Sequence, residues 1–171
     1  NSTWANKFKE TIHGSLISRL SHSDAIQLEK ASRDIKTRLP KLNKKCLALK
    51  RQLENHPYVK KVFHPDLCPN FQKIMKPNAG HGCLLSFELI GGSKKAEQVY
   101  DALQICKGPS FGTNFSLVSP YVLLAHYKEL EWAEKHGIPS HLLRVSVGLE
   151  PEEIIWERFE KALSHKKKIK R

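Results

Sequence analysis

Long apolar runs are absent from this sequence of 171 residues. No run approaches the roughly 20 residues that a membrane-spanning helix needs, which argues against a helical membrane protein. No secretory signal pattern follows Asn1. Because residues 1–20 read as the middle of a structure, we expect a piece of a longer chain. The four cysteines form no CxxC pair, and their wide spacing favours a reduced, cytoplasmic protein without a disulfide framework.

Acidic residues are also scarce. Lys and Arg number 29 against 17 Asp and Glu, a net charge of +12 that raises nucleic-acid binding as a hypothesis. The excess is spread over residues 41–51 and the tail 165–171, and the tail also resembles a nuclear localisation signal. No aromatic side chains alternate with these charges to stack on bases. A basic, non-catalytic nucleic-acid-binding domain therefore stays an alternative, and nucleic acid is not the expected partner.

One long helical pattern covers residues 24–55. Apolar residues recur there at steps of three and four, which predicts one buried stripe along a helix; they are Leu28, Ala31, Ile35, Leu39, Leu42, Cys46, Leu49 and Leu53. Pro40 lies inside this pattern and should kink or split the helix.

Shorter elements follow the long helix. Strands are expected at residues 58–63, 83–89, 103–107 and 142–149, and helices at 93–104, after Pro120 up to His136, and from Pro151 onward. Residues 108–119 read as a loop with a short apolar piece at 115–118. This order predicts an α+β fold, a two-layer sandwich of a mostly antiparallel sheet with helices on one face.

The strand at 142–149 carries the most informative pattern. Leu143, Val145 and Val147 share one face, whereas Arg144 shares the other with small residues that leave room for an anion. The planar fork of an arginine suits a carboxylate. By itself the local pattern favours an edge-strand arginine that faces solvent, because most arginines are exposed.

Residues 108–112 match the G-x-S-x-G pattern around a nucleophilic serine in α/β-hydrolases. That enzyme class needs a helix directly after the serine, followed by an acidic residue and a histidine. The residues after Ser110 do not read as a helix, and the remaining length cannot hold a hydrolase sheet. We interpret the segment as a turn, whose serine could still donate a hydrogen bond to a ligand.

Zinc ligands of the right types occur at His64, Cys68, His81 and Cys83. Their spacing does not match a zinc knuckle, and Cys83 lies in an apolar strand where buried thiols are common. No metal site is therefore predicted.

Several motifs together resemble a known family. Residues 142–163 read LLRVSVGLEPEEIIWERFEKAL, residues 109–117 read PSFGTNFSL, and residues 80–89 read GHGCLLSFEL. Residues 32–65 comprise an expected helix with an internal Leu-Pro, followed by the segment HPYVKKVFHP. In this order they are similar to the C-terminal part of the transsulfuration (Cys/Met metabolism) enzymes, which depend on pyridoxal phosphate (PLP). The resemblance covers roughly residues 24–164 and is nearest to the fungal cystathionine gamma-synthase-like branch.

The resemblance implies the small C-terminal domain of a fold-type-I PLP enzyme at residues 24–164, with the long linking helix at 24–55. Residues 1–23 would then end the preceding large domain or form a linker, and residues 165–171 a basic tail. In the family the Schiff-base lysine and most other PLP-binding groups lie upstream, so no catalytic residue is expected in this chain, which alone should be inactive. Arg144 matches the arginine that binds the substrate α-carboxylate, and Ser110 matches the loop serine that assists it.

The loop departs from the family pattern at two positions. Phe115 stands where an acidic residue is common, and Thr113 replaces a glycine. Both are predicted to affect which substrate is preferred, so a synthase and a lyase reaction both stay open. The expected full-length enzyme is a cytoplasmic tetramer, a dimer of dimers, that joins an O-acylhomoserine to cysteine in methionine and cysteine metabolism.

Overall fold

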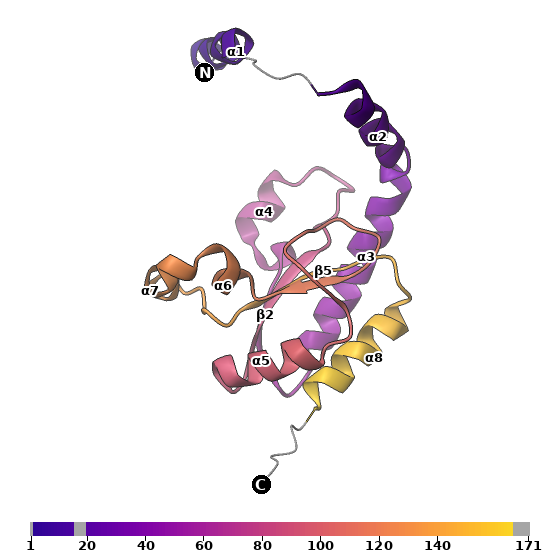
Figure 1. The fold of residues 1–171 in the computed structure, drawn as a ribbon, viewed down its shortest axis with the longest axis vertical. Helices are drawn as coiled ribbons and strands as arrows, with labels where there is room; N and C mark the ends of the chain where they lie inside the picture. Colours follow the sequence, from indigo (N-terminus) through magenta and orange to yellow (C-terminus); the bar gives the residue numbers. More distant parts are fainter. Residues whose placement is uncertain (1, 16–19, 166–171) are drawn as a thin grey trace. The chain divides into compact units, whose positions relative to one another are not determined.

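The computed structural model describes residues 2–15 and 20–165 of the chain (Figure 1). The chain divides into two units, Asn1–Lys36 and Thr37–Arg171, and each is considered by itself. In the first unit, helix α1 spans Ser2–Ser15 and helix α2 spans His22–Ser32. The side chain of Ser21 caps α2 by accepting a hydrogen bond from the backbone N–H of Asp24 at 3.1 Å.

Helix α3 spans Ile35–Glu54 and carries Pro40 in its second turn. The long helix expected at 24–55 is therefore interrupted between α2 and α3, and not at the proline. A start at Ile35 places Pro40 close to the helix N-terminus, where its missing N–H removes a single backbone hydrogen bond. The predicted stripe is buried only in its C-terminal half, whereas Leu28 and Leu39 are exposed; the buried members are Leu42, Cys46, Leu49 and Leu53.

The second unit is built on a five-stranded sheet with the order β1-β2-β5-β4-β3. Its strands are β1 (Val59–Phe63), β2 (Leu84–Leu89), β3 (Cys106–Lys107), β4 (Leu117–Ser119) and β5 (Leu143–Ser146). Pairs β1–β2, β2–β5 and β4–β5 are antiparallel, and β3–β4 is parallel, so the sheet is mixed. The α+β class is confirmed.

Strand β4 was not predicted as a strand. It has three residues and ends directly before Pro120, so it is too short to show an alternating pattern. The strand expected at 103–107 is reduced to Cys106–Lys107. Both short strands lie on the same side of β5, which therefore is the central strand of the sheet.

Three helices share one apolar core with the sheet: α3, α5 (Gly92–Ala102) and α8 (Glu152–Leu163). Phe87 of β2 and Phe159 of α8 meet edge to face, with ring centroids 6.1 Å apart. The alternating residues of β2 and β5 that face these helices are fully buried; they are Leu85, Phe87, Leu143 and Val145.

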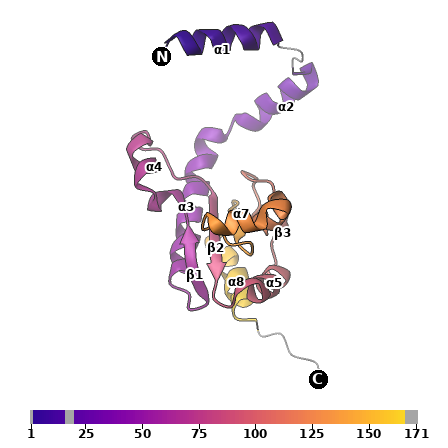
Figure 2. The same ribbon diagram turned by 90° about the vertical axis from the view of Figure 1, so that its left-hand side faces the viewer.

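The remaining elements are short. They are η1 (Pro65–Leu67), α4 (Pro69–Ile74), α6 (Tyr121–Ala125), η2 (Tyr127–Glu129) and α7 (Leu130–Lys135). Helices α6 and α7 lie on the side of the sheet away from α3 and α8 (Figures 1 and 2), an arrangement that the two-layer prediction did not include. The beginning of α6 is thereby brought to the polar face of β5.

Candidate substrate-carboxylate site

Arg144 lies on the central strand of the sheet. Its Cα pairs with Ser86 of β2 on one side and with Ser119 of β4 on the other. Directly paired residues point to the same face, so these three side chains form a polar row across the sheet. The alternative of an edge-strand arginine is wrong, because β5 is not at an edge and Arg144 is only partly exposed.

Two groups contact the Arg144 guanidinium. Nη2 donates a hydrogen bond to the carbonyl oxygen of Pro109, the residue before Ser110. The ring of Tyr121, the first residue of α6, lies with its centroid 4.0 Å from Cζ in a cation–π contact. The space that the small neighbours on β5 were expected to leave open is thus taken in part by a ring and a carbonyl.

The structure brings two of the predicted site residues to one place. Ser110 is exposed and follows the residue that Arg144 contacts. Between Ser110 and β4 the chain forms no helix, which agrees with the rejection of a hydrolase-type serine nucleophile.

Four hydrogen bonds hold the loop after Ser110 against β5 and its continuation. The backbone N–H of Gly112 donates to Ser146 Oγ at 3.1 Å. The Glu150 carboxylate accepts from the backbone N–H of Ser116 at 2.7 Å and from its hydroxyl at 3.0 Å. Ser116 Oγ in turn accepts from the N–H of Gly148 at 3.0 Å. These hydrogen bonds fix the path of the loop and, through Pro109, the surroundings of Arg144.

Glu150, Gly148 and Ser146 were not predicted to have this role. An added Cβ on Gly148 would lie 2.4 Å from the carbonyl carbon of Phe115, which explains why a glycine is needed there. The sequence offered a faint signal, because these residues share the polar face or the end of the strand that carries Arg144.

Phe115 and Thr113 lie further along the same loop. The Phe115 side chain is about half exposed, at 49%, and the Thr113 hydroxyl donates to the Phe115 carbonyl at 2.6 Å. The Phe115 backbone packs closely against Gly148, and its exposed ring is free to contact a substrate. Their effect on substrate preference stays a prediction.

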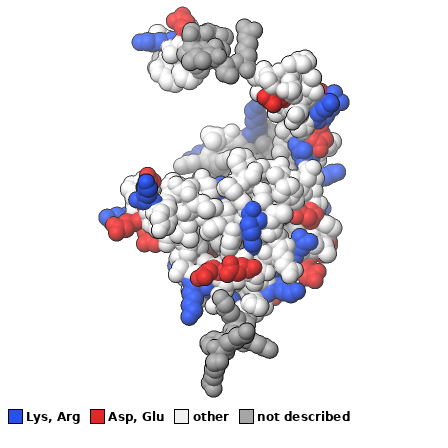
Figure 3. All heavy atoms as spheres, in the orientation of Figure 1, with Lys and Arg blue, Asp and Glu red and all other residues white. Residues whose placement is uncertain are grey.

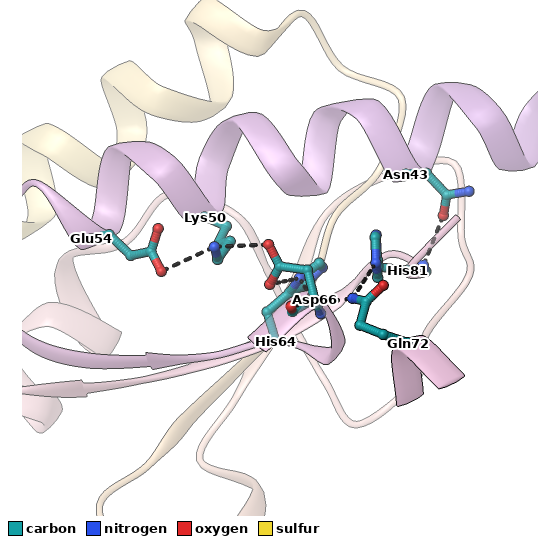
Figure 4. A network of polar contacts seen from close by, with 8 residues as sticks. Asn43, Lys50, Glu54, His64, Asp66, Gln72 and His81 are labelled. Carbon is teal, nitrogen blue, oxygen red and sulfur yellow. Dashed lines mark hydrogen bonds and ion pairs between the residues drawn. The ribbon is translucent and has the colours of Figure 1, made fainter. Parts of the chain in front are cut away.

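Of the candidate zinc ligands, His64 and His81 belong to a hydrogen-bonded network under α3 (Figure 4). Cys83 Sγ lies instead 3.9 Å from Ser146 Oγ, and Cys68 is exposed. His64 Nδ1 lies 2.7 Å from one oxygen of Asp66, and Lys50 Nζ lies 2.9 Å from the other. His81 contacts the amide of Gln72 at 2.9 Å. Over residues 2–15 and 20–165, no three His, Cys, Asp or Glu side chains are arranged to hold a metal ion.

Charge pairing sets the ionisation of this network. Burial acts to raise the pKa of Asp66, but the hydrogen bonds and charges of Lys50 and His64 outweigh it and hold that pKa below its usual value. Burial acts to lower the pKa of Lys50, and Asp66 and Glu54 more than reverse this effect. Lys50 is therefore a structural cation whose proton is held by two carboxylates.

Two other lysines have lowered pKa values, which could suggest a Schiff-base lysine. Burial lowers the pKa of Lys95, and burial opposed by the charge of Asp101 lowers that of Lys107. However, Lys95 Nζ donates to the Leu163 carbonyl at 2.7 Å, and Lys107 Nζ donates to two carbonyls at the end of α5. These amines serve as hydrogen-bond donors to the backbone and do not fit the role of binding the PLP aldehyde.

Two of the basic side chains of α3 are used within the fold. Lys50 is buried, and Lys45 Nζ donates to the Glu150 carbonyl at 2.8 Å. On the face of the second unit drawn in Figure 3, Lys and Arg are scattered among Asp, Glu and uncharged surface. This dispersed charge offers no track for a nucleic-acid backbone on that face. The basic tail from residue 166 onward lies outside the described residues.

In the part of the chain that the structure describes, no helix has both the length and the apolar character to cross a bilayer.

Comparison with known families decides what kind of protein carries this site. The family model described as "Cys/Met metabolism PLP-dependent enzyme" matches residues 1–164. The chain belongs to this family. The resemblance found in the sequence is thereby confirmed, and with it pyridoxal phosphate as the cofactor of these enzymes.

Curated relatives support the same branch. The chain is 40% identical over 166 residues to cystathionine gamma-synthase of Neurospora crassa and 36% identical over 169 residues to that of Saccharomyces cerevisiae, matches that cover 95% and 94% of the chain. The chain spans only 27% and 26% of the length of these relatives. It is thus similar to a part of each, about a quarter.

A solved structure shows the same fold. Cystathionine gamma-synthase from Xanthomonas oryzae pv. oryzae, in complex with cystathionine, superposes with a TM-score of 0.74 at 26% identity. The match covers 82% of this chain and 38% of that one. The mixed sheet with its helices is therefore an arrangement found in this family.

Proposed function

We propose that this chain is the C-terminal small domain of a PLP-dependent cystathionine gamma-synthase-like enzyme. The full-length enzyme would replace the γ-acyloxy group of an O-acylhomoserine by the sulfur of cysteine. The names of the fungal relatives and the mixed-sheet fold support this proposal. The Schiff-base lysine would come from another part of the full-length chain, since the described lysines with shifted pKa values are committed to structural contacts.

The observation that carries the proposal is the position of Arg144. A guanidinium on a central strand is held in one place, and its planar set of N–H donors matches the two oxygens of a carboxylate. Ser110 lies next to the carbonyl that Arg144 contacts and can add a hydroxyl donor. We assign the substrate α-carboxylate to these two residues.

Binding of that carboxylate has a chemical purpose. The cofactor supplies an electron sink for bond breaking at the substrate Cα. A carboxylate fixed at Arg144 sets the rotation of the substrate about its N–Cα bond. This rotation decides which bond of Cα is perpendicular to the plane of the electron sink. This domain would provide orientation and one wall of the pocket. We further propose a tetramer, built as a dimer of dimers, as the working assembly.

The test is steady-state kinetics of full-length Arg144→Ala and Arg144→Lys variants. We expect Arg144→Ala to raise the KM for the amino-acid substrate by about ten- to hundredfold, because a charge-assisted pair is lost. Arg144→Lys should recover only part of this, since an ammonium cannot form the planar fork. Arg51→Ala, which removes an exposed guanidinium from α3, is the matched control. An unchanged KM in Arg144→Ala would rule out the assignment.

The same assays identify the reaction. Cystathionine formed from cysteine and an O-acylhomoserine supports gamma-replacement, whereas ammonia and a 2-oxo acid without cystathionine would indicate elimination. Replacement of Phe115 by Glu should shift the ratio of these products if this loop position controls the choice.

A further inference from the structure

The contact between Tyr121 and Arg144 is established by the sheet itself. Ser119 of β4 pairs with Arg144, and Pro120 then turns the chain so that Tyr121 begins α6. The Tyr121 ring therefore lies over the side chain of Arg144, the residue with which Ser119 of β4 pairs. Its centroid lies 4.0 Å from Arg144 Cζ, a distance at which the ring face and the cation attract each other.

The geometry of a guanidinium makes this contact compatible with substrate binding. Its five N–H groups all point outward in the plane of the group, whereas an aromatic ring stacks on the face. A centroid 4.0 Å from Cζ fits such face-on stacking, in which the ring occupies no donor. One donor goes to the Pro109 carbonyl, and in-plane donors are left to pair with a carboxylate.

The Tyr121 ring has a second contact, with the histidine at the C-terminal end of α6. The ring of His126 meets the Tyr121 ring edge to face, with centroids 6.1 Å apart. His126 Nδ1 lies 3.2 Å from a carboxylate oxygen of Glu129. Within the described residues, the Tyr121 hydroxyl has no hydrogen-bond partner, so the ring and not the hydroxyl makes the contact with Arg144.

We propose that Tyr121 is a positioning residue, whose ring fixes the plane of the Arg144 guanidinium so that its donors meet the α-carboxylate of an amino-acid substrate. This inference rests on the proposed role of Arg144. A long arginine side chain loses rotamer freedom when it binds, and a ring that restricts it beforehand reduces that cost. The substrate feature that Tyr121 serves is the carboxylate alone.

The test uses the full-length holoenzyme with Tyr121→Phe, Tyr121→Leu and Tyr121→Met. Dissociation constants are measured by spectroscopic titration for an amino-acid substrate analogue and for the matching amine that lacks the carboxylate. We expect Tyr121→Leu and Tyr121→Met to weaken binding of the amino acid by about 2- to 30-fold and to leave the amine unchanged. Tyr121→Phe, which keeps the ring, should behave like the unsubstituted enzyme.

The Arg144→Ala background separates the two proposals. There, Tyr121→Leu should produce no further loss, because the group that it positions is gone. Equal weakening of amino acid and amine, no weakening of the amino acid, or a Tyr121→Phe variant as weak as Tyr121→Leu would each overturn the role of Tyr121. If Arg144→Ala itself leaves amino-acid binding unchanged, the proposed carboxylate site fails, independently of Tyr121. Tyr121→Met keeps the test decisive if the leucine variant does not fold.

Discussion

Gly148→Ala is the substitution whose effect follows most directly from the structure. The residue is buried, and its φ is not among the positive values that require glycine, so an alanine backbone fits there. The obstacle is space. A Cβ would lie 2.4 Å from the Phe115 carbonyl carbon and 2.6 Å from its Cα, which are backbone atoms that cannot rotate away.

The cost has two parts. The Phe115 backbone must move by about 1 Å to restore ordinary contact, and such overpacking costs about 1–3 kcal/mol. The same shift loosens the hydrogen bonds from Gly148 N–H to Ser116 Oγ at 3.0 Å and from Leu149 N–H to the Asn114 carbonyl at 2.8 Å. Each lost bond adds about 0.5–1.5 kcal/mol. We expect a total destabilisation of about 2–6 kcal/mol.

Urea unfolding, followed by circular dichroism, measures this loss. Gly137→Ala is the matched control, because Gly137 has φ +77° and nothing within 4 Å of the added Cβ. Its cost is backbone strain alone, about 1–2 kcal/mol. If Gly148→Ala destabilised the protein no more than Gly137→Ala, the steric explanation for the glycine, and with it the close packing of the loop on β5, would be refuted.

Two further predictions concern ionisable groups. Lys50 and His64 outweigh the effect of burial and hold the pKa of Asp66 below its ordinary value. Ionised Asp66 therefore stabilises the fold above about pH 4, the ordinary pKa of an aspartate. This stability is lost as the pH falls through the pKa of Asp66 in the folded state. Asp66→Asn should therefore destabilise the protein at pH 7 and progressively less below about pH 4 in unfolding experiments, and a difference that stayed constant would contradict this. Burial, with smaller effects of neighbouring charges, raises the pKa of the Cys46 thiol to about 12. Iodoacetamide at pH 8 should therefore alkylate the exposed Cys68 in the native protein, and Cys46 only after denaturation. Mass spectrometry identifies the alkylated cysteines. Labelling of both at one rate in the native protein would show that Cys46 is not buried.

Local periodicity accounts for the elements that the sequence predicted well. Two patterns repeat over several residues: the alternation at Leu143 and Val145, and the apolar stripe from Leu42 to Leu53. Each identifies a buried face even when the element that packs against it is not known. The break between α2 and α3 and the strand β4 were missed. Each is set within three residues or fewer, too short a stretch for a repeat to appear.

The position of Arg144 shows why the site could be predicted only in part. An arginine that alternates with buried residues has the same local pattern on an edge strand and on a central one. The difference lies in β4, which pairs with Arg144 through Ser119 and places Tyr121 over the guanidinium. The order of strands in a sheet depends on pairing between segments that are distant in the sequence. It therefore cannot be recognised from the residues next to Arg144. The family resemblance supplied the role proposed for the arginine, whereas the ring that we propose to orient it could be found only once the neighbouring strand was in place.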